Sequence, residues 1–229
     1  MRSNMMLLMA AAIWGLGFVA QRLGMDHMGP FTFNGLRFLL GALSLLPLLW
    51  WLKSRQPVAV AGDYRQLLTG GVLAGLVLFC AASLQQVGLL YTTAAKAGFI
   101  TGLYIILVPV IGLALRHKTG ANTWVGALIA MAGLYYLSVT EEFTIGYGDL
   151  LQVIGALFWA IHLLVLDHYS NRVAPIRLAG VQFVVCGLLS LGTAFVIETP
   201  TLGGAMAGWQ ALLYAGLVSV GIGYTLQVV

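Results

Sequence analysis

The chain has 229 residues, of which 60% are hydrophobic and only 8% are Asp, Glu, Lys or Arg. Soluble domains carry roughly 25% charged residues, so this composition excludes a water-soluble fold. The net charge of +4 comes from scattered residues rather than a basic block, which argues against nucleic-acid binding. Cys80 and Cys186 each lie in an apolar run, so we expect packing residues rather than a disulfide or a metal site.

Eight apolar stretches are long enough to cross a bilayer, whose core of roughly 30 Å needs about 20 helical residues. They run from Met5 to Gly24, Phe31 to Leu52, Gln66 to Leu90, Ala94 to Leu115, Ala121 to Val139, Gly148 to Tyr169, Ile176 to Ile197 and Gly208 to Val229. The connections between them are short and polar. The sequence therefore predicts an all-α, polytopic helical membrane protein.

The basic residues are divided unequally between the two sets of connections. With a cytoplasmic amino terminus, eight of the eleven Lys and Arg residues fall on the cytoplasmic side. Only Arg22, Arg37 and Lys96 fall on the outer side, where most of the acids gather. Because Lys and Arg are enriched in cytoplasmic loops, the amino terminus is expected to be cytoplasmic.

An internal repeat appears when the chain is shifted by 145 positions, which aligns Trp14 with Trp159 and Pro30 with Pro175. A shift of 141 positions aligns the identical segments 74–77 and 215–218, and Gln86 with Gln227. The first stretch thus has a counterpart, which argues for a retained helix rather than a cleaved signal peptide. Five spans separate equivalent positions, so the two units are expected to cross the membrane in opposite senses.

This repeat predicts two units, a first five-helix unit at 1–141 and a second unit at 148–229. The second unit has three of five helices. By symmetry about 50 residues and two helices of an expected ten are absent, so eight spans are present.

Several segments resemble the EamA-like family of the drug/metabolite transporter superfamily. They are AAAIWGLGFVAQR at 10–22, GPFTFNGLRFLLGAL at 29–43, AASLQQVGLLYTTAAKAGFITGLYIILVPVIG at 81–112, GALFWAIHLLVLDHYS at 155–170 and AGLVSVGIGYTLQVV at 215–229. The resemblance implies a ten-helix protein of two inverted units. It also implies a multi-pass carrier or exporter of small metabolites in the bacterial inner (plasma) membrane.

Polar side chains inside the spans are candidates for solute contact, because an embedded polar group needs a partner or water. On the second stretch, Asn34 and Arg37 share one helical face. Arg37 either lines a cavity or reaches outward to the lipid headgroups. On the sixth stretch, His162 lies near mid-span, where an imidazole either binds solute and relays protons or bonds a neighbouring helix.

The repeat supplies further candidates in pairs. Trp14 and Trp159 are either aromatic walls of a cavity or core filling. The pairs Ser83 with Gln86 and Tyr224 with Gln227 suggest a shared cavity at the repeat interface, or interhelical packing bonds. Lys96 opens the fourth stretch on the outer side and is followed by Tyr104, and Pro109 is expected to kink the helix. The candidate solute-binding residues are Trp14, Asn34, Arg37, Ser83, Gln86, Lys96, Tyr104, Trp159, His162, Tyr224 and Gln227.

The basic residues Arg22, Arg37 and Lys96 lack a matching embedded acid in the sequence, which predicts an anionic or zwitterionic solute such as an amino acid or organic acid. No catalytic or nucleotide-binding motif appears, so no enzyme activity, cofactor or metal is expected. The leading hypothesis is a secondary transporter that works by alternating access. A lipid-modifying enzyme, a membrane scaffold and a nonfunctional truncated remnant are the alternatives, and self-association as a homodimer is left open.

Overall fold

The computed structural model describes residues 2–55, 64–115, 120–138 and 146–228. Within these ranges the regular elements are all helices. In chain order they are α1 (Arg2–Gly24), α2 (Pro30–Arg55), α3 (Tyr64–Gly88), α4 (Ala94–Gly102), α5 (Tyr104–Ala114), α6 (Ala121–Ser138), α7 (Tyr147–Ser170), α8 (Pro175–Ile197), α9 (Leu202–Ala207), α10 (Trp209–Leu213), the π-helix η2 (Tyr214–Gly223) and α11 (Tyr224–Val228). The predicted all-α fold is confirmed.

Six segments are long and apolar enough to cross a membrane, and they correspond to six of the eight predicted stretches. They are Pro30–Trp51, Tyr64–Gly88, Ala94–Ala114, Tyr147–Ser170, Pro175–Ile197 and Trp209–Leu226. The first and fifth predicted stretches contain shorter apolar helical segments, Leu8–Gly24 and Ala121–Gly133. The chain is therefore a polytopic helical membrane protein, although only six stretches meet the length expected of a full span.

Two spans depart from a simple α-helix. The fourth is interrupted at Leu103, between α4 and α5, whereas Pro109 lies buried inside α5. The helix is thus broken six residues before the proline, at a place that the sequence did not predict. The last span contains the ten-residue π-helix η2. Its wider turns carry small residues close to α2, since a Cβ on Gly216 would lie 2.7 Å from Leu40 Cβ.

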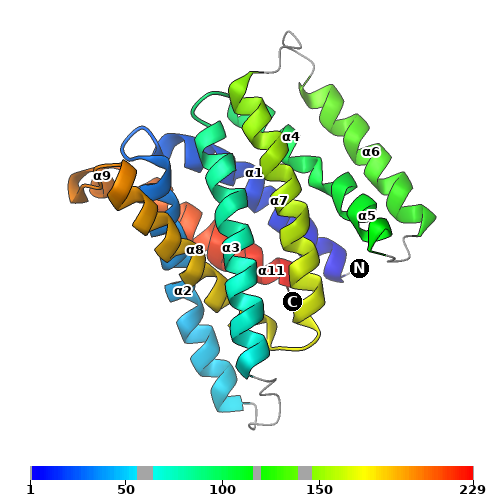
Figure 1. Ribbon diagram of the computed structural model, residues 1–229, viewed down its shortest axis with the longest axis horizontal. Helices are drawn as coiled ribbons and strands as arrows, with labels where there is room; N and C mark the ends of the chain where they lie inside the picture. The colour runs from blue at the N-terminus through cyan, green and yellow to red at the C-terminus, as the bar shows by residue number, and fades with distance from the viewer. Residues whose placement is uncertain (1, 56–63, 116–119, 139–145, 229) are drawn as a thin grey trace.

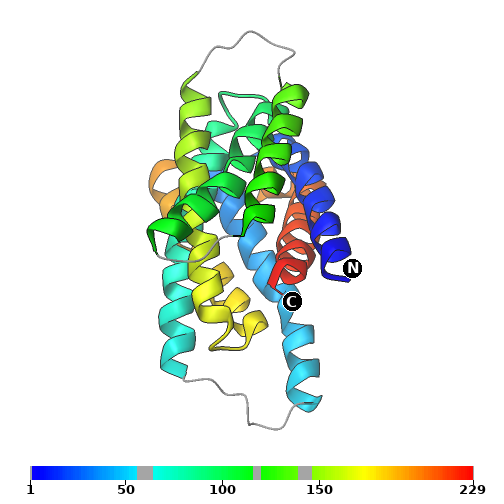
Figure 2. The ribbon, with the colours of Figure 1, turned by 90° about the vertical axis from the view of Figure 1, so that its right-hand side faces the viewer.

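The helices form one bundle in which α3 lies against both α7 and α8, and α2 lies against α8 and η2 (Figure 1). On one side, α4 and α5 pack between α7 and α6. On another side, α1 packs against α10, η2 and α11 (Figure 2). The contact of α1 with η2 is thus the counterpart of the contact of α7 with α3, as the internal repeat predicts.

The halves of the bundle that correspond to the two predicted repeat units contribute α2 and α8. These two equivalent helices run in opposite directions. Gly35 of α2 faces Leu191 of α8, and Leu39 faces Gly187, so the two helices lie antiparallel (Figure 1). A Cβ on Gly35 would lie only 2.5 Å from Leu191 Cγ, so the halves approach closely here. This inverted arrangement places the α2–α8 contact at the centre of the bundle.

Two ends of the bundle can be distinguished by this topology. The Pro30 end holds the start of α2, the end of α3, the start of α7 and the end of α8. The Pro175 end holds the opposite termini of these four helices. Between the ends, the central core groups Phe38, Leu78, Phe183, Cys186 and Tyr224, with Trp14 and Trp159 packed against them.

Candidate functional site

Arg37 lies in the middle of the bundle, on the α2 face that points to the central core. Only 4% of the residue is exposed, and its Cζ lies 4.8 Å from the centre of the Phe38 ring. Tyr224 and Cys186 belong to the same buried cluster as Phe38. The guanidinium makes no hydrogen bond or ion pair with any described residue, and its buried Nε has no partner. Arg37 therefore points into the protein rather than outward to the headgroups, and its charge is not neutralised within the described chain.

Aromatic rings form the wall of this site around Tyr224. The Tyr224 ring lies 5.4 Å from Trp14, 5.4 Å from Phe183 and 6.3 Å from Trp159, measured between ring centres. The two equivalent tryptophans differ in bonding. Trp14 donates from Nε1 to the Ser219 carbonyl over 3.2 Å, whereas the buried Nε1 of Trp159 has no partner among the described residues.

His162 forms a buried pair with Gln182 of the neighbouring helix α8. His162 Nε2 lies 2.7 Å from Gln182 Oε1, and the His162 ring also meets the edge of Trp159 at 5.8 Å. Because an amide oxygen only accepts, this geometry makes Nε2 the protonated nitrogen of the neutral ring. His162 Nδ1 and Gln182 Nε2 are left buried with no partner in the described structure. The expected bond to a neighbouring helix thus exists, yet one acceptor and one donor stay available.

Gln182 was missed by the sequence-based selection, although a signal for it was present. The shift of 145 positions that aligns Trp14 with Trp159 also aligns Arg37 with Gln182. Both side chains lie fully or almost fully buried at equivalent places of the α2–α8 contact. The site is therefore lined by residue pairs related by the inverted repeat.

A second group of polar residues consists of Asn34 on the same face of α2 and of side chains from the neighbouring helices α1 and α3. Asn34 donates from Nδ2 to the Ala82 carbonyl over 3.0 Å, and Gln86 donates from Nε2 to the Gln21 carbonyl over 3.5 Å. The side-chain oxygens of Asn34, Gln86 and Gln21 are buried and unpaired in the described structure, as is the Ser83 hydroxyl. Gln21 was also missed, although it lies two helical turns from Trp14 on one face of α1. Unsatisfied buried acceptors are unusual in folded proteins, so these atoms are candidates for contact with a solute.

Lys96 does not belong to this central group. Its Nζ lies 2.6 Å from Asp149 Oδ2, and the Asp149 side chain is 5% exposed. The expectation that the basic residues lack an embedded acid is therefore wrong for Lys96. The acid was overlooked because it lies 53 residues further along the chain, in the first turn of α7, and only the packing of α4 on α7 brings the two together.

Tyr104 and Gln227 are the remaining predicted residues, and the structure describes the side chain of only the first. Tyr104 is the first residue of α5 and is half-buried. Gln227 belongs to α11, but its side chain lies outside the described residues. The structure therefore links Trp14, Arg37, Trp159 and His162 through ring contacts around Tyr224 and Phe38, and adds Gln182 as the partner of His162. Asn34, Ser83 and Gln86 belong to the second group of polar residues.

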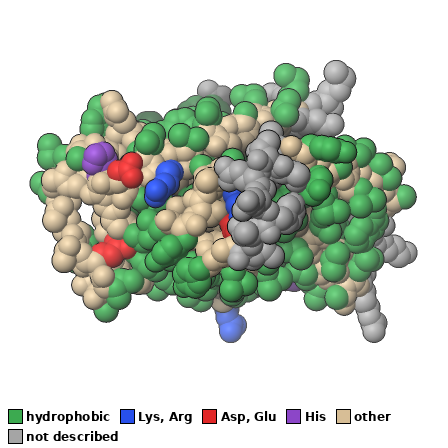
Figure 3. Space-filling model, turned by 90° about the horizontal axis from the view of Figure 1, so that it is seen from above, with side chains coloured by type: hydrophobic (Ala, Val, Ile, Leu, Met, Phe, Trp, Pro, Cys, Tyr) green, Lys and Arg blue, Asp and Glu red, His purple; other side chains and the backbone are tan. Residues whose placement is uncertain are grey.

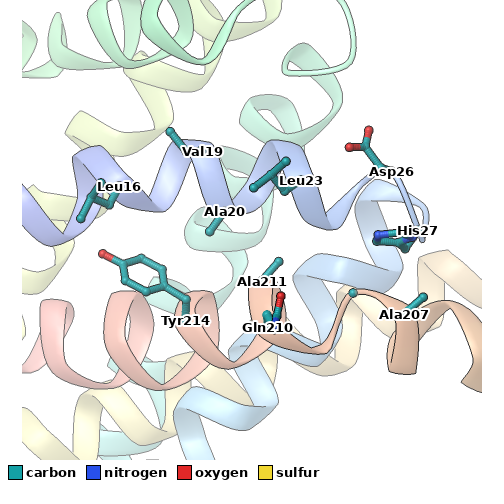
Figure 4. A pocket seen from close by; sticks show the side chains of 11 residues that line it. Leu16, Val19, Ala20, Leu23, Asp26, His27, Ala207, Gln210, Ala211 and Tyr214 are labelled. Carbon is teal, nitrogen blue, oxygen red and sulfur yellow. The ribbon is translucent and has the colours of Figure 1, made fainter.

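A groove of about 480 Å³ lies elsewhere, between α1 and the α9–α10 segment (Figure 4). Leu16, Val19 and Leu23 form its apolar wall, and Asp26 and His27 lie at one end of it. The Tyr214 hydroxyl faces α1 and donates to the Ile13 carbonyl over 3.0 Å. None of the predicted solute-binding residues lines this groove, so it is distinct from the central site.

Among known proteins, the chain is similar to several membrane transporters. An uncharacterized transporter of Archaeoglobus fulgidus is 34% identical over 85% of this chain, and the chain spans 58% of that relative's length. The uncharacterized inner membrane transporter YedA of Escherichia coli is 24% identical over 91% of the chain and 68% of its own length. A probable amino-acid metabolite efflux pump of Salmonella typhimurium is 27% identical over 65% of the chain and 52% of its own length.

A protein of known crystal structure has the same fold, with a TM-score of 0.73 over 99% of this chain and 78% of that protein. Sequence identity to it is 18%, so the likeness concerns the fold alone. The model of the EamA-like transporter family matches residues 1–139 and 146–229, which together cover nearly the whole sequence. With the inverted helical arrangement, this match shows that the chain belongs to the EamA-like transporter family.

Proposed function

We propose that the protein is a secondary transporter in which the central site binds a small anionic or zwitterionic metabolite. The observation that carries this proposal is Arg37, a 4% exposed cation without an ion pair or hydrogen bond in the described structure. Holding a charge near the middle of a span costs roughly 2.5 to 3.5 kcal/mol on insertion scales. A carboxylate of a solute would offset this cost by pairing with the guanidinium.

Unpaired polar atoms that adjoin the central core through Trp159 suit a small polar solute. His162 Nδ1 is a free acceptor, and Gln182 Nε2 and Trp159 Nε1 are free donors in the described structure. These atoms could bind the other end of a solute whose carboxylate meets Arg37, while the rings of Trp14 and Tyr224 enclose its apolar part. Amino acids and organic acids have this chemistry, and the name of the Salmonella relative supports an amino-acid metabolite.

Alternating access would follow from the inverted arrangement of the halves. The proposed units, 1–141 and 148–229, meet along α2 and α8, and the central site lies at this contact. Rocking of one half against the other would open the site to one side of the membrane at a time. We propose this transport cycle together with its coupling to protons through His162.

The proposed location is the bacterial inner membrane with a cytoplasmic amino terminus. The E. coli relative named as an inner membrane transporter supports the membrane, and the distribution of Lys and Arg supports the orientation. Reporter tags placed in the turns at Pro30 and Pro175 test the inverted topology, and we expect them on opposite sides. Tags on one common side would overturn it.

Solute flux in proteoliposomes tests the function. Proteoliposomes that contain the purified protein are loaded with an unlabelled amino acid or organic acid. Counterflow of the same radiolabelled solute, added outside, is then measured for wild type and for Arg37→Gln across a panel of such solutes. We expect flux of at least one acidic or zwitterionic solute that Arg37→Gln abolishes or shifts toward neutral solutes. The exposed Arg177 supplies the matched control, Arg177→Gln, which should transport as wild type does. Unchanged flux and unchanged charge preference in Arg37→Gln would overturn the proposed site.

A further inference from the structure

Two carboxylates connect the halves of the bundle at its Pro30 end. Asp149, in the first turn of α7, accepts from Lys96 Nζ at 2.6 Å and from the Thr92 hydroxyl at 2.7 Å. Lys96 and Thr92 belong to the first half, and Asp149 belongs to the second. The Gly146 amide also donates to Asp149 over 2.9 Å, which holds the carboxylate at the start of its own helix.

Glu198 makes the second contact, directly after the end of α8. Its two oxygens accept from the amides of Phe31 and Thr32 over 2.8 Å and 2.9 Å. The Thr32 hydroxyl adds a third bond of 2.6 Å. These amides belong to the first turn of α2, whose own backbone leaves them unpaired, so a residue of the second half caps a helix of the first half.

Among the described residues at the Pro175 end, the halves meet in an apolar cluster. It consists of Ala74, Leu166, Val173 and Leu178, with Leu67 and Tyr169 packed against it. A hydrogen-bonded carboxylate loses its partners once the helices that carry them separate, because a hydrogen bond weakens steeply with distance and angle. The hydrogen bonds that Asp149 and Glu198 make across the halves would therefore be lost if the Pro30 end opened. Figure 3 views this end and shows acidic side chains at separate places on it.

We propose that Asp149 and Glu198 are the gating residues of the Pro30 end, which keep the central site closed to that side until both contacts break. This inference rests on the proposed alternating access and assigns the residues that control one of its two openings. Removing either contact should raise the population of the form that is open at the Pro30 end, because the contacts stabilise only the closed form.

Cys186 provides a native reporter of this opening. It is fully buried in the central core, in the same cluster as Phe38, whose ring centre lies 4.8 Å from Arg37 Cζ. Replacing the other cysteine by Cys80→Ala leaves Cys186 as the single thiol. A small, membrane-impermeant, charged thiol reagent such as a sulfonated methanethiosulfonate then modifies Cys186 only when the site is open to the face where the reagent is added.

The experiment adds this reagent to each face of the membrane in turn, with intact cells and inverted vesicles. Two cysteine-free proteins carrying Gly203→Cys or Asn171→Cys identify the face of each end. A Cβ on Gly203 meets no atom within 4 Å, and Asn171 is exposed in the turn between α7 and α8. These markers make the result independent of the assumed orientation.

We expect Cys186 of the otherwise unchanged protein to react slowly from the Pro30 face. Asp149→Asn and Glu198→Gln should each accelerate the reaction, and the double variant should reach about tenfold, as a change of 1.4 kcal/mol in the gating equilibrium would give. The matched control is Thr193→Val, which removes a bond within α8 to the Leu189 carbonyl and should leave the rate unchanged. The exchanged pair, Lys96→Asp with Asp149→Lys, should restore a slow reaction.

An unchanged rate in the double variant, with both markers labelled normally, would overturn the gating role. If Asp149→Asn does not fold, Thr92→Val removes one bond to the intact carboxylate and should give a smaller acceleration. Failure of the proposed function has a different signature. Cys186 would then respond to the gate variants, while the wild-type protein moves no solute of the panel.

Discussion

Arg37 and Lys96 are two cations of the first half, and they differ in exposure and in whether an acid pairs with them. Lys96 has a 34% exposed side chain and is held by Asp149, while Arg37 is 4% exposed and has no acidic or hydrogen-bonding partner among the described residues. The paired cation joins two helices at one end of the bundle. The unpaired cation lies among aromatic rings at the centre. The comparison teaches that the charge of an embedded residue does not by itself favour a solute site, and that the proposed site rests on a charge without a partner.

Arg37→Met should have the largest effect and sharpens the comparison most. We expect solute flux to fall by about tenfold or more, because a charge-assisted hydrogen bond is worth about 1.5 to 3 kcal/mol. The same change should raise stability by up to about 2 kcal/mol, because the buried charge no longer has to be accommodated. Flux in proteoliposomes and the apparent melting temperature in detergent measure the two effects. A loss of both flux and stability would show that Arg37 is a structural residue.

Asp149→Ala, which removes the acid paired with Lys96, should lower stability, whereas Arg37→Met should raise it. The change removes the acceptor of three hydrogen bonds and leaves Lys96 without its carboxylate, which should lower stability by about 1 to 3 kcal/mol. The apparent melting temperature measures it. The exposed Asp26 supplies the control, Asp26→Ala, which should melt as wild type does. Equal melting of all three proteins would mean that the ion pair contributes nothing to the fold.

Gln182→Leu tests whether the partner of His162 matters for solute binding. The change removes an unpaired donor and the acceptor of His162 Nε2, so we expect the KM of flux to rise by about three- to tenfold. The maximal flux should change less. The control is Gln210→Leu, at an exposed residue that lines the groove between α1 and the α9–α10 segment. It should leave the KM unchanged. A wild-type KM in Gln182→Leu would remove this residue from the site.

The equivalent tryptophans give the smallest and most selective test. Trp14→Phe removes the bond to the Ser219 carbonyl and should lower stability by about 0.5 to 1.5 kcal/mol, whereas Trp159→Phe removes an N–H that has no described partner. Trp159→Phe should therefore leave melting unchanged and weaken solute binding. Melting curves and the KM of flux separate the two outcomes. Identical behaviour of the two variants would contradict the assignment of Trp159 Nε1 to the solute.

Much of the central site could be found from the sequence, because polar residues are rare inside apolar spans. Arg37, His162 and the two tryptophans stood out for that reason, and Gln182 was available through its alignment with Arg37. Gln21 and Asp149 were not singled out as partners. Their partners lie 65 and 53 residues away in the chain, and no local pattern encodes a contact at that separation.

The sequence by itself determined the helices, their approximate ends and the inverted repeat. Lipid offers no hydrogen-bonding partner to the backbone, so a long apolar run has to be helical wherever it packs. Only the tertiary structure decided which polar groups satisfy one another. Lys96 is neutralised because α4 packs on α7, whereas Arg37 lies against the Phe38 ring and meets no acid among the described residues. That choice depends on distances of a few ångströms between helices, which the hydropathy of a single helix does not contain.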